Sequence, residues 1–248
     1  MSRLEIYSPE GLRLDGRRWN ELRRFECTTS TKNSSNNSDG SSYLEMGQNK
    51  VIAVVNGPME PLNKAQVNQE KALLKISINL TKFSKMRRSN SSNKNEKRIL
   101  EMQTALERTF SETVQLNLYP RTMIEVKLHV LQQDGGMMGC LINSVTLALI
   151  DAGIAMYDYI SGVSVGLMDQ QPLLDLNSLE ETSLSSITLG VLGKTEKLSM
   201  LLIEDKIPLD RVESVLSIGI AGCHQIRDLM DAHLRRAGAE KLEKLSHQ

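Results

Sequence analysis

Two adjacent basic residues, Lys97 and Arg98, end the most strongly charged segment of the chain. Between Lys82 and Arg98, seven residues are basic and one, Glu96, is acidic. Lys and Arg side chains that displace counterions from phosphates supply most of the sequence-independent affinity for nucleic acid. The alternative is a solvated loop ahead of a helix, although the helix dipole disfavours cations at a helix start. We therefore favour a contact with a polyanion, with Lys97 and Arg98 at or near the start of that helix.

A glycine-rich turn offers a second candidate, an anion site built from the backbone. Residues 134–139 read Asp-Gly-Gly-Met-Met-Gly, and a turn of this kind between a strand and a helix can point its N–H groups at a phosphate. The run lacks the Lys-Ser/Thr of a P-loop and the spacing of a dinucleotide fingerprint. Met137 and Met138 stand where a phosphate site would use hydroxyls or arginine. The pattern by itself favours a tight turn with the methionines packed below it.

A group of acidic residues is the third candidate. Asp169 and Asp175 are close in sequence to Glu180 and Glu181, and no basic residue lies between Asp169 and Glu181. Two carboxylates near a phosphodiester could hold Mg²⁺ or act as acid and base. From spacing alone, acids at strand ends and turns are the better interpretation. No Ser-His-Asp or Cys-His set can be assembled from the histidines and cysteines, which we interpret as packing or surface residues.

Strands and helices predicted from the hydrophobic pattern must position these residues. Strict alternation of apolar and polar residues predicts strands at 74–80 and 124–130. Apolar residues three or four apart predict a helix over 99–114, and a mostly apolar helix ends at Gly153. A last helix begins near Pro208. Further strands are predicted at 51–55, 163–167, 173–176, 186–192 and 198–203.

Two segments are expected to be loops or turns. The Ser/Thr/Asn-rich stretch 28–42 is interpreted as a strand end followed by a surface loop, and Gly57-Pro58 as the turn that closes the strand at 51–55. The order of elements predicts an α+β (mixed α/β) fold, with helices covering one face of a sheet.

Composition limits the class of protein. The 248 residues carry 30 Lys+Arg and 30 Asp+Glu, which excludes a globally basic nucleic-acid binder but leaves room for local basic patches. With 40% hydrophobic and 24% charged residues, the chain is typical of a soluble globular protein. We expect no membrane span, no signal peptide and no cysteine-based zinc site, because the three cysteines are far apart. Aromatics at 4% are too sparse for a surface built on base stacking.

Taken together and in order, a set of short motifs resembles the RNase PH superfamily over nearly the whole chain. The start at residues 8–18 is especially similar to the fungal form of the exosome ring subunit whose archaeal counterpart is catalytic. The motifs are Asp15-Gly16-Arg17-Arg18, residues 40–47, Gly57-Pro58, Tyr119-Pro120-Arg121, Asp134-Gly135-Gly136, residues 147–154, Val165-Gly166, and Asp175-Leu176-Asn177 with Glu180-Glu181.

The resemblance implies a single RNase PH-like domain over 1–248, made of two similar β-α halves at about 15–150 and 151–235. It also implies a six-membered ring of such subunits around a central channel. Active members cleave RNA from its 3′ end by phosphorolysis, with inorganic phosphate as the nucleophile. That reaction needs cations and hydroxyls that hold phosphate against an anionic phosphodiester.

Site residues follow from the same resemblance. Asp169 and Asp175 match the two acidic active-site positions of the family. Lys97 and Arg98 match a basic pair that grips the RNA backbone, and Lys64 matches a basic residue in a loop that lines the channel neck.

The chain departs from active members at the phosphate site. After Gly135-Gly136, active members carry Thr-Arg or a similar polar pair, whereas this chain has Met137, Met138 and Gly139. Thioethers donate neither hydrogen bonds nor charge to phosphate. We therefore expect a degenerate phosphate site and vestigial carboxylates. The alternative is an active phosphate-dependent 3′–5′ exoribonuclease that uses Asp169 and Asp175.

The expected function is therefore that of a non-catalytic exosome ring subunit that guides RNA 3′ ends through a central channel, with no cofactor and no metal. The resemblance implies the following partners: other RNase PH-like ring subunits, S1/KH-type cap subunits, a hydrolytic 3′–5′ exoribonuclease and single-stranded RNA, with no membrane. It also implies work in the nucleus, nucleolus and cytoplasm, on rRNA, mRNA and other RNAs.

Overall fold

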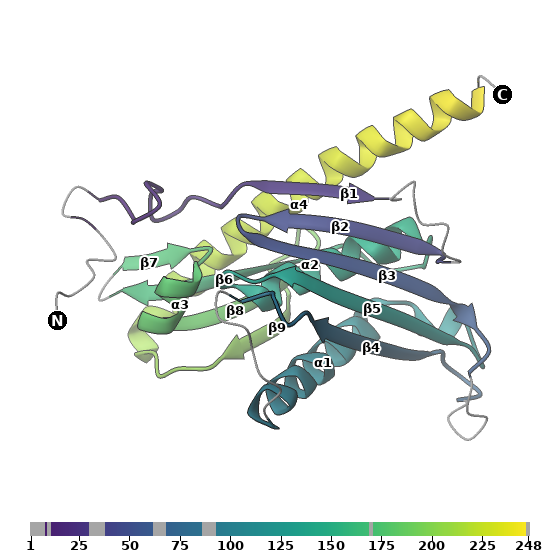
Figure 1. Ribbon diagram of the computed structural model, residues 1–248, viewed down its shortest axis with the longest axis horizontal. Coiled ribbons are helices and arrows are strands. Elements are labelled where there is room, and N and C mark those ends of the chain that lie inside the picture. Colours follow the sequence, from purple (N-terminus) through teal and green to yellow (C-terminus); the bar gives the residue numbers. More distant parts are fainter. Residues whose placement is uncertain are drawn as a thin grey trace.

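The computed structural model describes residues 8, 11–29, 38–61, 68–85, 93–168 and 171–246. Two antiparallel-rich sheets and four α-helices make an α+β fold, as predicted (Figure 1). The first sheet has the strand order β1-β2-β3-β5-β4, with β4 parallel to β5. Its strands are β1 (Phe25–Thr29), β2 (Gly40–Met46), β3 (Asn49–Met59), β4 (Leu73–Leu80) and β5 (Met123–Gln132).

The second sheet is antiparallel throughout and has the order β7-β6-β8-β9. Its strands are β6 (Ile160–Met168), β7 (Gln171–Leu174), β8 (Ser185–Leu192) and β9 (Leu198–Ile203). The helices are α1 (Asn93–Thr113), α2 (Met137–Asp151), α3 (Ser178–Ser183) and α4 (Leu209–Ser246), and a short 3₁₀ turn follows α1 at Leu116–Leu118.

Helix α2 forms the centre of the core. Every residue from Met137 to Leu149 is buried, and the helix packs against β2 and β3 of the first sheet and β6 of the second. Its polar side chains satisfy backbone groups of those strands. Asn143 donates to the carbonyl of Gly162 at 2.9 Å and accepts from its N–H at 2.8 Å. This mostly apolar helix is buried all round because the two sheets cover it from both sides.

The other helices lie outside this core. Helix α1 packs on β4 at one edge of the first sheet, and α4 packs along β6 and β8 and then extends past the body of the molecule (Figure 1). No helix in the described part of the chain is long and apolar enough to cross a membrane.

Two expectations about elements were wrong. The strand end expected at the start of the 28–42 stretch is confirmed by β1, which reaches Thr29, but the loop expected up to Ser42 is wrong at its end, because β2 begins at Gly40; residues 30–37 lie outside the described residues. Strand β3 does not end at Gly57-Pro58 but continues to Met59, with a register shift between Asn56 and Met59 that accommodates the proline. In addition, strand β2, whose first residues were expected to be loop up to Ser42, and the short helix α3 had not been predicted.

The start of α1 was also misplaced. The helix begins at Asn93, so Lys97 and Arg98 lie in its second turn rather than at its start. The helix dipole acts mainly on the first turn. The helix dipole therefore opposes Lys97 and Arg98 less than expected, and the groups around them decide what they can bind.

Candidate functional site

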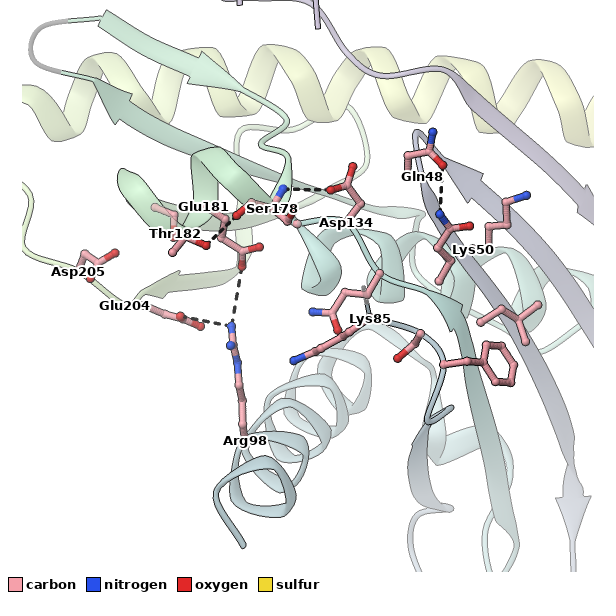
Figure 2. Close-up of a pocket in the computed structure, with 17 residues that line it drawn as sticks. Gln48, Lys50, Lys85, Arg98, Asp134, Ser178, Glu181, Thr182, Glu204 and Asp205 are labelled. Carbon is pink, nitrogen blue, oxygen red and sulfur yellow. Dashed lines mark hydrogen bonds and ion pairs between the residues drawn. The ribbon is translucent and has the colours of Figure 1, made fainter. Parts of the chain in front are cut away.

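An open pocket of about 1100 Å³ lies where the two sheets meet. Its walls come from segments far apart in the sequence: the β2–β3 turn, the residues after β4 and β5, helix α1, helix α3, and the residues after β9. Figure 2 shows that charged side chains of both signs point into it. The basic residues that line it are Lys50, Lys85 and Arg98, and the acidic ones are Asp134, Glu181, Glu204 and Asp205.

Arg98 reaches into this pocket from α1. Its Nη2 lies 3.8 Å from Oε1 of Glu181 and 3.7 Å from Oε2 of Glu204, and its side chain is 53% exposed. Both distances exceed those of a direct hydrogen bond, so these are solvated ion pairs of modest strength. The guanidinium therefore remains accessible to another anion.

Lys97 points to the neighbouring surface of α1. It is exposed, and together with Arg98, Glu101 and Glu204 it lines a smaller pocket of about 550 Å³. The two basic residues therefore form one contiguous surface at the second turn of α1, as their predicted joint role requires.

The glycine turn borders the same pocket. Gly135 and Gly136 have φ values of +66° and +58°, and a Cβ on Gly135 would lie 2.4 Å from the carbonyl carbon of Asn177. Asn49 holds the turn, because its side chain accepts from the N–H of Asp134 at 2.5 Å and donates to the carbonyl of Gly135 at 2.6 Å. Only glycine fits this backbone without strain.

One backbone donor of the turn already has an anionic partner. The N–H of Gly136 donates to Oε2 of Glu181 at 3.2 Å, and α2 begins at the next residue. Met137 and Met138 point away from solvent and are 4% and 5% exposed. Neither thioether could donate to a phosphate. The residues after the turn therefore contribute packing rather than ligands.

Asp175 lies below the pocket wall rather than in it. Its carboxylate is fully buried, and both oxygens are occupied by Arg23: the side-chain Nη2 donates to Oδ1 at 2.7 Å, and the backbone N–H to Oδ2 at 2.8 Å. Burial lowers the pKa of Arg23, but the charge and hydrogen bond of Asp175, together with the charge of Asp134, outweigh burial, so the pKa lies above the usual arginine value. In this arrangement Asp175 fixes the N-terminal segment against the second sheet.

A second buried ion pair was not anticipated from the sequence. Arg13 and Glu180 are both completely shielded, with Nε donating to Oε1 at 2.7 Å. Glu180 also completes a capping box with Asn177 at the start of α3. The Asn-x-x-Glu spacing at 177–180 is the signal that could have predicted both the cap and the helix. Nothing in local spacing could have predicted Arg13 as its partner.

The remaining predicted site residues are Lys64 and Asp169, and both lie outside the described residues. Their assignments stay predictions. Within the part of the chain that the structure describes, no three His, Cys, Asp or Glu side chains are grouped so as to hold a metal ion.

Comparisons with known proteins place the chain in a family. The model "3' exoribonuclease family, domain 1" matches residues 21–155, and "3' exoribonuclease family, domain 2" matches residues 158–222. The chain belongs to the RNase PH family. Most of the described pocket residues lie within these two matched segments, on elements that the RNase PH fold supplies.

Relatives match this RNase PH chain over almost its full length. It is 64% identical to "Exosome complex component SKI6" of Saccharomyces cerevisiae, over 99% of each chain. It is 32% identical to "Exosome complex component Rrp41" of Archaeoglobus fulgidus, over 92% of this chain and 88% of that protein. The crystal structure of rice (Oryza sativa) Rrp46 superposes with a TM-score of 0.78 at 28% identity, over 90% of this chain and 100% of that one.

Proposed function

We propose that this chain is an exosome ring subunit that guides single-stranded RNA along Lys97 and Arg98 and does not itself catalyse phosphorolysis. The names of its relatives support the exosome assignment, since fungal and archaeal proteins that match nearly end to end are exosome components. The proposal that the chain does not catalyse phosphorolysis rests on the glycine turn, where buried Met137 and Met138 stand in place of phosphate ligands.

The guiding role is supported by the surface at the second turn of α1. Lys97 and Arg98 are exposed, adjacent and borne on a rigid helix rather than a loop. Two such cations can contact consecutive phosphates of a single strand without reading its bases. Lys64 is proposed to add a third contact near the channel neck.

The alternative is an active phosphate-dependent 3′–5′ exoribonuclease. It is favoured by the family itself, whose models describe 3' exoribonucleases. Phosphorolysis needs groups that hold inorganic phosphate. The described turn offers two thioethers and a backbone N–H that already donates to Glu181, which argues against this alternative. In the proposal, neither Asp175 nor Asp169 takes part in catalysis any longer.

The partners proposed for the subunit are other RNase PH-like ring subunits, S1/KH-type caps and a hydrolytic 3′–5′ exoribonuclease that receives the RNA. Such complexes would act in the nucleus, nucleolus and cytoplasm.

The catalytic half of the proposal is tested by product analysis. The assembled ring without any hydrolase should release no nucleoside diphosphates from RNA when inorganic phosphate is added, because the phosphate ligands are missing. Thin-layer separation of radiolabelled products measures this directly. Phosphate-dependent diphosphate release that disappears in Asp169→Asn would establish the alternative function.

The proposed incorporation of this chain into a ring makes a separate prediction. Strands β1 and β4 end the first sheet, β7 and β9 end the second, and β9 exposes Leu201 and Ile203 at 44% and 46%. Open edges with exposed apolar side chains are an aggregation hazard in a lone subunit. Tagged chain purified from cells should therefore be recovered with ring partners, as mass spectrometry and light scattering can show. A stable monomer at micromolar concentration without partners would count against it.

A further inference from the structure

Arg98 is held by carboxylates from two different elements of the second half of the chain. Glu181 comes from α3 and Glu204 from the segment after β9, and Figure 2 shows the guanidinium pointing between them. No described residue other than these two forms an ion pair with Arg98. A residue proposed to contact RNA therefore already has two anionic partners in the same chain.

The two carboxylates differ in how firmly they are fixed. Glu181 is 28% exposed and is anchored through its other oxygen to the N–H of Gly136 at 3.2 Å. Glu204 is 52% exposed. Glu181 is thus anchored to the glycine turn, whereas Glu204 is a more exposed partner that lines the same pocket.

Lys97 is in a different situation from its neighbour. Within the described residues, no carboxylate lies within ion-pair distance of its ammonium group, and its side chain is exposed. RNA phosphate can therefore approach Lys97 without displacing anything but counterions.

We propose that Glu181 and Glu204 form an acidic clamp that competes with RNA phosphate for Arg98. This inference rests on the proposed RNA contact and deepens it. Lys97 makes the first contact with the strand, and Arg98 joins when a phosphate displaces the clamp. The exchange is feasible because the ion pairs at 3.7 and 3.8 Å are longer than hydrogen bonds, whereas a phosphate can accept a bidentate pair from guanidinium. A weakly held or short polyanion would gain less from Arg98 than a threaded strand.

The clamp makes a directional prediction: removing acids should strengthen RNA binding. An exposed ion pair changes an equilibrium by about two- to fivefold. Glu204→Gln should therefore tighten RNA binding about two- to fivefold, and Glu181→Gln with Glu204→Gln should tighten it further. Both side chains are partly exposed, and neither is the capping residue of α3, so the variants should fold.

The experiment is an anisotropy titration of the assembled complex with a labelled oligouridylate long enough to thread the ring. The matched control is Asp205→Asn, which removes the same charge from an exposed acid of the same pocket that forms no ion pair with Arg98. Its effect should stay below twofold. Repeating Glu204→Gln in an Arg98→Gln background completes a double-mutant cycle, in which the gain should vanish.

The outcomes separate the clamp from the function on which it rests. The clamp is overturned if Glu204→Gln and the double variant bind no tighter, if the gain survives in the Arg98→Gln background, or if Asp205→Asn gives the same gain. In these cases weaker binding by Lys97→Gln and Arg98→Gln still supports the RNA contact. If those two variants bind RNA like wild type, the proposed contact fails and the clamp fails with it.

Discussion

Reversing both charges at the second turn of α1, with Lys97→Glu and Arg98→Glu, should slow decay of long single-stranded tails by the complete complex at least tenfold. Two attractive contacts become repulsive, and neither depends on base identity, so the loss should be uniform across RNA sequences. The salt dependence of binding should flatten by about 0.7 in the log–log slope for each phosphate contact removed. Decay time courses and anisotropy at several salt concentrations measure both effects.

Assembly should survive this change, since exposed substitutions away from packing usually alter stability by about 0.5 kcal/mol or less. Lys194→Glu with Lys197→Glu is the matched control, because these exposed lysines lie in the turn between β8 and β9, at the opposite end of β9 from Glu204. The control should leave decay unchanged. If the Lys97/Arg98 variant degrades and binds long RNA like wild type at low and high salt, these residues are merely solvated.

Breaking the buried pair between Arg23 and Asp175 should produce a large loss of stability. Asp175→Ala leaves a 5%-exposed guanidinium without the carboxylate to which it donates a hydrogen bond, and it removes the acceptor of the Arg23 backbone N–H. Removing one partner of a buried ion pair costs about 3–5 kcal/mol. The free energy of unfolding of the full chain, from denaturant titration, should fall by that amount.

An exposed pair one residue along the chain provides the control. Arg24 and Glu26 pair at the surface with side chains 81% and 51% exposed, so Glu26→Ala should cost less than about 1 kcal/mol. Equal stability of Asp175→Ala and Glu26→Ala would show that Asp175 does not fix the N-terminal segment.

Elements with a clean hydrophobic period were predictable. Strand β9 was predicted at its observed limits, Leu198–Ile203, and β5 was predicted from alternation at 124–130, within its observed range. Strand β2 was missed because the first part of its buried face carries small and polar residues, and only Leu44 and Met46 are large and apolar. Ser42 is fully buried and donates to the carbonyl of Ser144 in α2, and a Cβ on Gly40 would lie 2.5 Å from the Ala152 nitrogen. Because α2 packs closely against β2, positions 40 and 42 carry residues that do not show the apolar alternation of a strand.

The basic and acidic clusters near the candidate site stand out in the sequence, but the pairing between them does not. Lys97 and Arg98 stand out as a local charge run, whereas Glu181 and Glu204 reach Arg98 only through the fold. The pairing of Arg23 with Asp175 likewise spans 152 residues. Spacing along a chain carries no information about such contacts, so Asp175 was matched to an active-site position of the family, as a vestigial residue, without its structural partner being visible.

The central claim is that RNA passes over the second turn of α1. A photoreactive side chain at position 101 tests it most directly, because Glu101 lines the same smaller pocket as Lys97 and Arg98, and replacing it leaves both basic residues intact. Position 26 on β1, at the opposite edge of the first sheet from β4, is the comparison. In a complete complex stalled on long single-stranded RNA, we expect a cross-link from position 101 at a fixed distance from the 3′ end and none from position 26. A complex that degrades this RNA yet cross-links at position 26 and not at position 101 would contradict the account.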